Sequence, residues 1–190
     1  MELIGVLLAA GAGTRLGRPG GLMHAPDGTP WVVSSVRVLR EAGCSRIGVV
    51  VGASAPDVVC LLTDEDVTIV PSPSWSDGLS ASVRAGLGWA GETDAPVAVV
   101  HMVDRPRVGV AVVRRVVAAA APAPVEGNAP ADHTRLARAS YDGASGYPVV
   151  IGRAHWGAAG AAATGDRSMG PYLKRVPCPL IPCDDLLDPA

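Results

Sequence analysis

Three short and almost continuously apolar segments constrain the fold of this chain more than any other feature. They are LIGVLL at residues 3–8, RIGVVVG at 46–52 and APVAVVHM at 95–102. A strand that does not alternate apolar with polar residues is covered on both faces, as in a parallel sheet between two layers of helices. The three segments therefore indicate buried strands of such a sheet.

Helical patterns lie between these strands, which is typical of parallel βαβ units. Thr29 is expected to cap a helix whose first residue is Pro30 and which ends at Gly43. Asp77 is expected to cap a helix that runs through Trp89. Further helices are expected at 55–62, from 108, at about 153–163 and at 168–175, and a third strand at 67–70.

The segment at 121–134 is rich in alanine and proline and is expected to be a surface excursion. Two strands, at 135–142 and 146–153, should follow it, and the excursion and these two strands together are expected to form a small flap at the edge of the sheet. The pattern as a whole predicts an α/β chain with a single domain over residues 1–190. It would be a three-layer α/β/α sandwich with a mostly parallel, Rossmann-like sheet. Ligands of such sheets bind at the carboxyl ends of the strands, where the strand order reverses.

Composition and charge exclude several classes of protein. Hydrophobic residues make up 48% of the chain and charged residues 18%, which excludes a disordered chain. The formal charge of −2 and the lack of a basic run give no electrostatic reason to expect binding to nucleic acid or to an acidic membrane. The apolar N-terminal run is too short to span a bilayer, and the four cysteines form no CxxC pair. We therefore expect reduced thiols and a cytoplasmic location.

The first apolar segment runs directly into a glycine-rich loop, AAGAGTRLGRPGG. Gly11, Gly13 and Gly17 would let backbone amides approach a phosphate, and the guanidinium of Arg15 suits phosphate oxygens. A Walker A loop is excluded because GxxxxGK[ST] does not occur. A dinucleotide fingerprint is disfavoured because Leu16 stands at its third glycine and no carboxylate ends the second strand. A nucleotide loop and a plain strand–turn–helix junction remain as alternatives.

The segment LAAGAGTRLGRP resembles the opening signature of the MobA-like nucleotidyltransferases, LAxGxxxRxGxxK. Ala10 before Gly11 is more similar to the branch of molybdenum cofactor cytidylyltransferases (MocA-type) than to the guanylyltransferase branch. Further segments resemble family elements in the expected order: WSDGLSASVRAGL at 75–87, HMVDRP at 101–106, YDGASGYPVVIGR at 141–153 and TGDRSMGPYL at 164–173. The resemblance spans most of the chain and implies a sheet of the nucleotide-diphospho-sugar transferase type.

The resemblance also implies a reaction: a nucleoside monophosphate passes from a nucleoside triphosphate to a phosphorylated acceptor, and pyrophosphate is released. Arg15 and Asp104 would be catalytic, and Asp104 would bind Mg²⁺ as the metal ligand. The nucleotide-binding residues would be Leu8, Ala9, Ala10, Gly11, Ala12, Gly13, Arg15, Arg18, Asp77, Gly78, Ser80 and Ser82. The acceptor-binding residues would be Gly146, Tyr147, Pro148, Asp166 and Arg167. Capping or loop roles remain the alternatives for Asp77, Ser80 and Asp104, and a loop salt bridge for Asp166 and Arg167.

Two positions depart from the family pattern. Gly20 stands where the family has a lysine near the triphosphate, and Tyr147 stands where it usually has a histidine. Arg15 or Arg18 would be the substitute for the lysine. The C-terminal segment CDDLLDPA has no secure counterpart of the family's acidic DxDTP-like element.

The leading hypothesis is an enzyme that transfers CMP to the molybdopterin cofactor. Its nucleotide would be CTP, favoured over GTP, and its product would be delivered to a molybdoenzyme or its chaperone. One alternative is a catalytically weak or inactive relative that binds nucleotide or pterin as a carrier or regulator. Another is a nucleotidyltransferase for a different phosphorylated acceptor.

Overall fold

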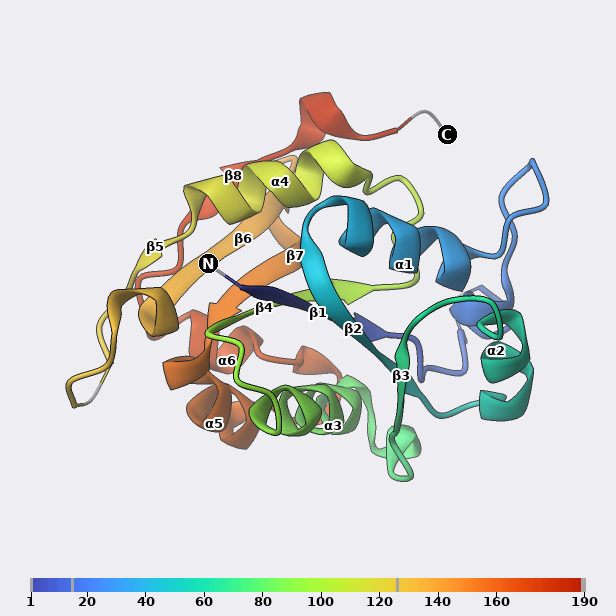
Figure 1. The fold of residues 1–190 in the computed structure, drawn as a ribbon, viewed down its shortest axis with the longest axis horizontal. Helices are drawn as coiled ribbons and strands as arrows, with labels where there is room; N and C mark the ends of the chain where they lie inside the picture. Colours follow the sequence, from blue (N-terminus) through green and yellow to red (C-terminus); the bar gives the residue numbers. More distant parts are fainter. Residues whose placement is uncertain (1, 15, 126, 189–190) are drawn as a thin grey trace.

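A mixed sheet covered by helices on both faces forms the centre of the molecule (Figure 1). The computed structural model describes residues 2–14, 16–125 and 127–188, and eight strands lie within these ranges. They are β1 (Leu3–Leu8), β2 (Cys44–Val51), β3 (Thr68–Pro71), β4 (Val97–Met102), β5 (Ala121–Pro122), β6 (Arg135–Tyr141), β7 (Ala144–Gly152) and β8 (Leu180–Pro182). Their order is β3-β2-β1-β4-β7-β6-β5, and β8 pairs with β6. The predicted α/β fold with a central sheet between helices is confirmed.

The strand order reverses beside β1. This strand is parallel to both of its neighbours, β2 and β4, and β2 is parallel to β3. The chain moves outward from β1 to β3 and then crosses back to β4 on the other side of β1. Because such crossovers are right-handed, the reversal sends the helix of the third connection to the opposite face of the sheet. The carboxyl ends of β1 and β4 are therefore the place where a ligand site is expected.

The helices divide between the two faces of the sheet as Figure 1 shows. They are α1 (Trp31–Glu41), α2 (Ala55–Leu61), α3 (Leu79–Gly91), α4 (Val110–Ala119), α5 (Arg153–Ala162) and α6 (Gly170–Leu173). Leu7 of β1 packs with buried residues of α1, α2 and α4, whereas Leu8 packs with those of α3, α5 and α6. Both faces of β1 are therefore buried, as its apolar sequence predicts. No helix among the described residues has the length and apolarity needed to cross a membrane.

The two strands β6 and β7 were expected to form a flap at the sheet edge, and this prediction is wrong. β7 pairs antiparallel with β4, from Val97 opposite Gly152 to Val100 opposite Val149. β6 then pairs with β7 on its other side. The physical reason lies in β7 itself, because residues 147–152 (YPVVIG) are all buried and carry no charged side chain. A strand of that kind belongs inside a sheet, covered on both faces.

Two helix caps differ from the sequence prediction. Thr29 does not cap α1, because the N-cap is Pro30 and no side chain bonds the first turn. The backbone of Thr29 is engaged instead in a turn, where its N–H donates to Asp27 Oδ1 (2.8 Å). Asp77 does not cap α3 either, because Asp77 ends a 3₁₀ turn and Gly78 is the N-cap. Both changes arise from tight turns that end just before the helix begins.

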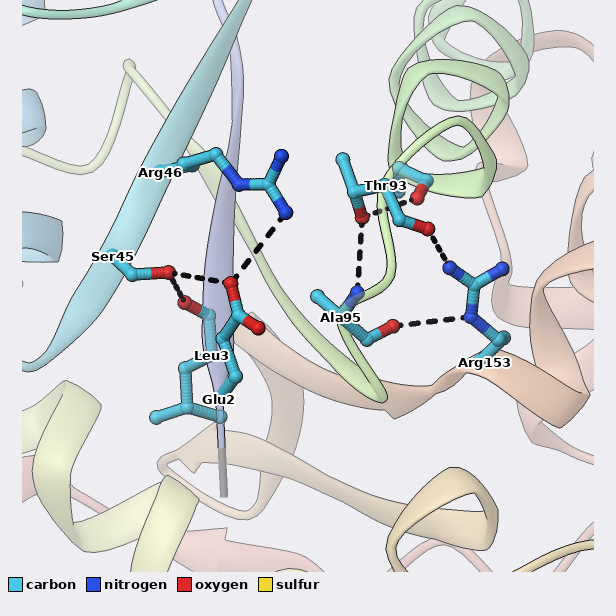
Figure 2. A network of polar contacts seen from close by, with 8 residues as sticks. Glu2, Leu3, Ser45, Arg46, Thr93, Ala95 and Arg153 are labelled. Carbon is cyan, nitrogen blue, oxygen red and sulfur yellow. Dashed lines mark hydrogen bonds and ion pairs between the residues drawn. The ribbon is translucent and has the colours of Figure 1, made fainter.

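The amino ends of the parallel strands are closed by polar contacts, which Figure 2 shows as two groups. In one group Arg46 of β2 lies 3.5 Å from a carboxylate oxygen of Glu2, next to the start of β1. In the other group Arg153 donates through Nε to the carbonyl of Ala95 (3.1 Å) and also bonds the carbonyl of Thr93. These contacts lie at the amino ends of the parallel strands β1, β2 and β4. The carboxyl ends of these strands lie at the opposite end of the sheet, where a ligand site is expected.

Gly86 lets α3 lie close to β1 of the sheet, and this close packing leads to a prediction about stability. A Cβ built at Gly86 would lie 2.4 Å from Cγ1 of the buried Val6, whereas a Cβ at Gly88 would meet nothing within 4 Å. Gly86→Ala should therefore lower the free energy of unfolding by about 1–3 kcal/mol through overpacking. Gly88→Ala is the matched control in the same helix and should raise it by about 0.5–1 kcal/mol. Urea unfolding of both variants checks this, and equal effects would contradict the close packing.

The burial of His101 in β4 leads to a prediction about how folding stability depends on pH. It is buried (1% exposed), and burial, with the nearby Arg105, lowers the pKa of His101 to about 4 from an ordinary value near 6.5. The unfolded chain takes up a proton below pH 6.5 while the folded chain does not, so folding stability falls as the pH drops from 6.5 to 4. The contribution lost is roughly 3 kcal/mol.

The variant His101→Met should flatten this part of the stability curve, measured by urea unfolding between pH 7 and pH 4. His133→Met is the control, since His133 lies half-buried in the 3₁₀ turn Ala131–Thr134, and it should leave the curve as it is. An undiminished acid loss in His101→Met would show that other groups cause it.

Candidate functional site

A cavity of about 540 Å³ opens at the carboxyl ends of β1 and β4, next to the start of α3. This first cavity is lined by Leu8, Ala10, Gly11, Ala12, Gly13, Thr14, Leu16, Gly20, Trp75, Ser76, Gly78, Leu79, Ser82, Met102, Val103, Asp104 and Asp166. Its volume falls in the range of roughly 300–1,000 Å³ that is usual for small-molecule sites. The cavity lies where the reversal of strand order predicts a ligand site.

The glycine loop gives the first cavity a wall of backbone. Gly11, Ala12 and Gly13 all line it. Within the described residues no backbone carbonyl accepts a hydrogen bond from the N–H groups of these three residues. Backbone amides without an internal partner, beside small side chains, are suited to binding the oxygens of an anion.

Gly13 fixes the shape of this loop. Its φ is +66°, and a Cβ built on it would lie 1.8 Å from the carbonyl oxygen of Arg18. The carbonyl of Gly13 also accepts a hydrogen bond from the N–H of Leu16 (2.8 Å), which closes a tight turn. Only glycine fits both requirements, so the loop geometry depends on this residue.

Asp104 follows β4 and lines the first cavity, as its place in the sequence predicts. Its side chain is 24% exposed, and one carboxylate oxygen lies 3.8 Å from Nε of Arg105. The side chain is therefore partly exposed at the cavity, while its Oδ1 atom is buried. The described residues contain no cluster of three or more His, Cys, Asp or Glu side chains that could hold a metal ion. Mg²⁺ needs no such cluster, because it is commonly held by one or two carboxylates together with phosphate oxygens and waters.

The start of α3 forms the opposite wall, and a residue from the C-terminal part of the chain completes it. Asp166, 87 positions beyond Leu79, accepts a hydrogen bond from the N–H of Leu79 (3.3 Å). Gly78, with φ +100°, permits this approach, because a Cβ there would lie 2.8 Å from Asp166 Oδ1. Gly78 and Ser82, two of the predicted nucleotide contacts, line the cavity. The predicted nucleotide contacts Asp77 and Ser80 do not line it, and Ser80 is buried.

Gly20 lies at the first cavity beside Asp104. A Cβ built on Gly20 would lie 3.1 Å from Cγ1 of Val103 and 3.7 Å from Cβ of Asp104. A long side chain at this position would therefore start next to the carboxylate. The 3₁₀ turn Gly20–Leu22 holds the backbone of this residue against β4 and its following residues.

Of the two arginines proposed to replace the missing lysine, the structure describes one, Arg18. Arg18 bonds the carbonyl of Leu22 through Nη2 and does not line the first cavity. Arg15 lies outside the described residues, so its predicted catalytic and nucleotide-binding roles stay predictions. Of the remaining predicted nucleotide contacts, Leu8 and Ala10 line the cavity, whereas Ala9 is buried and donates its N–H to the carbonyl of Val50 (2.9 Å).

A second cavity of about 200 Å³ adjoins the first. Leu79, Met102 and Asp166 line both cavities. The other residues that line the second cavity are Arg105, Arg138, Tyr147, Val149, Arg167, Ser168, Met169, Gly170 and Leu173. Three of the predicted acceptor residues, Tyr147, Asp166 and Arg167, are therefore brought together here. Gly146 and Pro148 line neither cavity.

Tyr147 occupies the place of the expected family histidine and is held rigidly. Its hydroxyl forms a 2.6 Å hydrogen bond with Oγ of Ser168, and burial raises the pKa of Tyr147 above its ordinary value. Tyr147 therefore remains a neutral hydrogen-bonding group at the second cavity near neutral pH.

Sequence reasoning missed several residues of the two cavities. Trp75 and Met102 line the first cavity, although a tryptophan and a strand-end methionine are read from sequence as packing residues. Arg105 and Arg138 line the second cavity. Arg138 had a weak sequence signal, since it is the charge in the apolar run Leu136–Ala139 of β6.

Comparison with known proteins gives a consistent picture of the family. Residues 5–178 match the family described as "MobA-like NTP transferase domain". The chain is 31% identical, over 185 residues, to a protein of Paenarthrobacter nicotinovorans named nicotine blue oxidoreductase, with 95% of this chain and 87% of that protein covered.

Solved structures share the fold. Rv0371c from Mycobacterium tuberculosis H37Rv has a TM-score of 0.75 at 23% identity, with 100% of this chain and 90% of that chain covered. The same protein in complex with manganese has a TM-score of 0.71 at 23% identity, with the same coverage. A nucleotidyl transferase from Methanothermobacter thermautotroptrophicus has a TM-score of 0.69 at 21% identity, with 88% of this chain and 79% of that chain covered.

Proposed function

This chain belongs to the MobA-like NTP transferase family, and from that premise we propose that it binds a nucleoside triphosphate in the first cavity and transfers its nucleoside monophosphate to a phosphorylated acceptor. The single observation that carries the proposal is that Gly11, Ala12 and Gly13, whose N–H groups bond no described backbone carbonyl, line the same cavity as Asp104. The four negative charges of a triphosphate need such donors and a cation at close range.

The chemistry is an in-line displacement at phosphorus. An oxygen of the acceptor phosphate forms a bond to the α-phosphorus, the bond from the α-phosphorus to the bridging oxygen breaks, and pyrophosphate leaves with the electron pair. The chain's own contribution is to hold the triphosphate along the glycine loop and to orient the acceptor from the second cavity. Asp104 would hold Mg²⁺, which would neutralise phosphate charge when bound. The manganese complex of Rv0371c supports a divalent ion in this fold.

We propose CTP as the nucleotide, in preference to GTP, and a molybdopterin-type cofactor as the acceptor. Ala10 supports the choice of base, since it is similar to the residue of the cytidylyltransferase branch at this position and lines the first cavity. Delivery of the product to a molybdoenzyme or its chaperone belongs to the same proposal. A different phosphorylated acceptor would use the same two cavities.

Two alternatives rest on specific observations. The missing lysine at Gly20 favours a weak or inactive relative that carries nucleotide or pterin, because one cation fewer faces the triphosphate. The name of the Paenarthrobacter relative favours an oxidoreductase. The sequence argues against binding of a nicotinamide dinucleotide, because β2 is followed by Gly52 and Ala53 and lacks the carboxylate that binds the ribose.

A panel of CTP, GTP, ATP and UTP, each with and without Mg²⁺, tests the proposed function by thermal shift. CTP with Mg²⁺ should raise the melting temperature most, because a ligand that binds only the folded state stabilises it by mass action. Asp104→Asn should remove the effect of Mg²⁺, whereas Asp57→Asn, on the exposed surface of α2, should retain it. A flat panel would sink the nucleotide proposal.

Gly20→Lys separates an impaired nucleotide site from one that no longer functions. The new ammonium should tighten binding of CTP with Mg²⁺ by about 10-fold or more, as a charge-assisted contact to phosphate does. Gly20→Met is the matched control, because it adds the same crowding against Val103 without the charge. Isothermal titration measures both variants. If lysine and methionine behave alike, the loop geometry does not bring position 20 to the triphosphate.

A further inference from the structure

Arg138 is a half-buried cation that lines the second cavity and forms no ion pair with a described carboxylate. It lies on β6, where its neighbour on β7 is Val149, so it sits inside the sheet and not at a free edge. Its Nε is buried and has no hydrogen-bond partner. No carboxylate in the described part of the chain forms an ion pair with it. Burial accordingly lowers the pKa of Arg138 below its ordinary value.

The other arginines at the second cavity have partners within the protein. Arg105 lies 3.8 Å from the carboxylate of Asp104. Arg167 donates through Nη2 to Oγ1 of Thr164 (3.0 Å). The carboxylate of Asp166 accepts from the N–H of Leu79 (3.3 Å). Among the described residues, Arg138 differs from these two arginines in that its Nε is buried without a hydrogen-bond partner.

A buried cation without a partner is costly, and a hydrophobic residue would normally be more stable at such a position. On a strand whose flanking residues Leu136, Ala137 and Ala139 are fully buried and apolar, the fold gives no structural reason for a guanidinium. The cost is offset if a ligand supplies the missing charge. Planar guanidinium groups bind carboxylate and phosphate oxygens through paired hydrogen bonds.

The surroundings of Arg138 restrict the ligand further. The lining of the second cavity combines polar groups with the apolar residues Met102, Val149, Met169 and Leu173. Leu79, Met102 and Asp166 line both cavities. The ligand would therefore place an apolar body beside its anionic group and reach toward the nucleotide. Tyr147, fixed by Ser168, adds one hydrogen-bonding hydroxyl to this wall.

We propose that Arg138 is the specificity-determining residue of the acceptor subsite, and that the acceptor is an amphiphilic oxyanion whose phosphate or carboxylate Arg138 binds while its apolar body lies in the second cavity. This proposal rests on the proposed function, because it assigns the second cavity to the acceptor of the same reaction. It adds the residue that selects an anionic acceptor and the chemical class of that acceptor.

The test uses the full chain and four small probes. Phenyl phosphate and benzoate combine a ring with each of the two oxyanions, inorganic phosphate lacks the ring, and benzyl alcohol lacks the charge. Binding is measured by changes in amide chemical shifts on titration. Phenyl phosphate or benzoate should bind more tightly than inorganic phosphate and benzyl alcohol, with shifts at Tyr147 and Ser168. The better of the two identifies the oxyanion as phosphate or carboxylate.

Three variants make the test specific. Arg138→Met should weaken binding of the aromatic anion about 10-fold or more, since a charge-assisted hydrogen bond is lost. Arg138→Lys should recover part of that loss. Arg46→Met, at the amino end of β2, is the control and should bind as the unaltered chain does. Binding of CTP with Mg²⁺ should be the same in all four proteins, and Arg138→Met should be at least as resistant to urea as the unaltered chain.

Equal binding of the aromatic anions by the unaltered chain and Arg138→Met would overturn the proposal. A marked loss of stability in Arg138→Met would also overturn it, because Arg138 would then serve the fold. If Arg138-dependent anion binding is found in a chain that binds no nucleotide, the proposed function fails and the anion site stands. If nucleotide binds and no anion does, the anion site fails and the proposed function stands.

Discussion

The burial of β1 on both faces is the constraint on which the rest of the structure depends. Leu7 and Leu8 point to opposite apolar clusters, so helices must cover both sides of this strand. The chain achieves this by laying β2 and β3 on one side of β1 and then returning to β4 on the other. The same reversal separates the connections at the carboxyl ends of β1 and β4. The covering of one strand and the opening of the first cavity therefore have a single topological cause.

The first cavity is built mainly from backbone and small side chains. Gly13 accepts a conformation that other residues resist, and Gly78 lets Asp166 reach the start of α3. Asp166 joins a segment near the C-terminus to the helix that follows β3, and it lines both cavities. The polar groups of the site are thus held by parts of the chain far apart in sequence, and their relative positions depend on the packing of α3 against the sheet.

Charge is distributed unevenly over the two cavities. On the side of the glycine loop a cation expected from the family is absent at Gly20, and Arg18 is turned to the carbonyl of Leu22. On the side of the second cavity no described carboxylate forms an ion pair with Arg138, whose Nε is buried without a hydrogen-bond partner. If the two cavities bind triphosphate and acceptor as we propose, the described arginines lie on the acceptor side. The proposed nucleotide side offers backbone amides and the carboxylate of Asp104.

The sequence alone determined six of the eight described strands, the α/β class and the family. It also placed the glycine loop after β1 and Asp104 after β4, because these features depend on short-range patterns of apolar residues and glycines. β1 occupies the residues predicted for it, 3–8. The tertiary structure decided what depends on long-range pairing. It inserted β7 beside β4, replaced Asp77 by Asp166 at the start of α3, and brought Arg138 to the second cavity. No local pattern encodes these contacts, since the partners lie many residues apart and meet only when the strand order and the faces of the sheet are set.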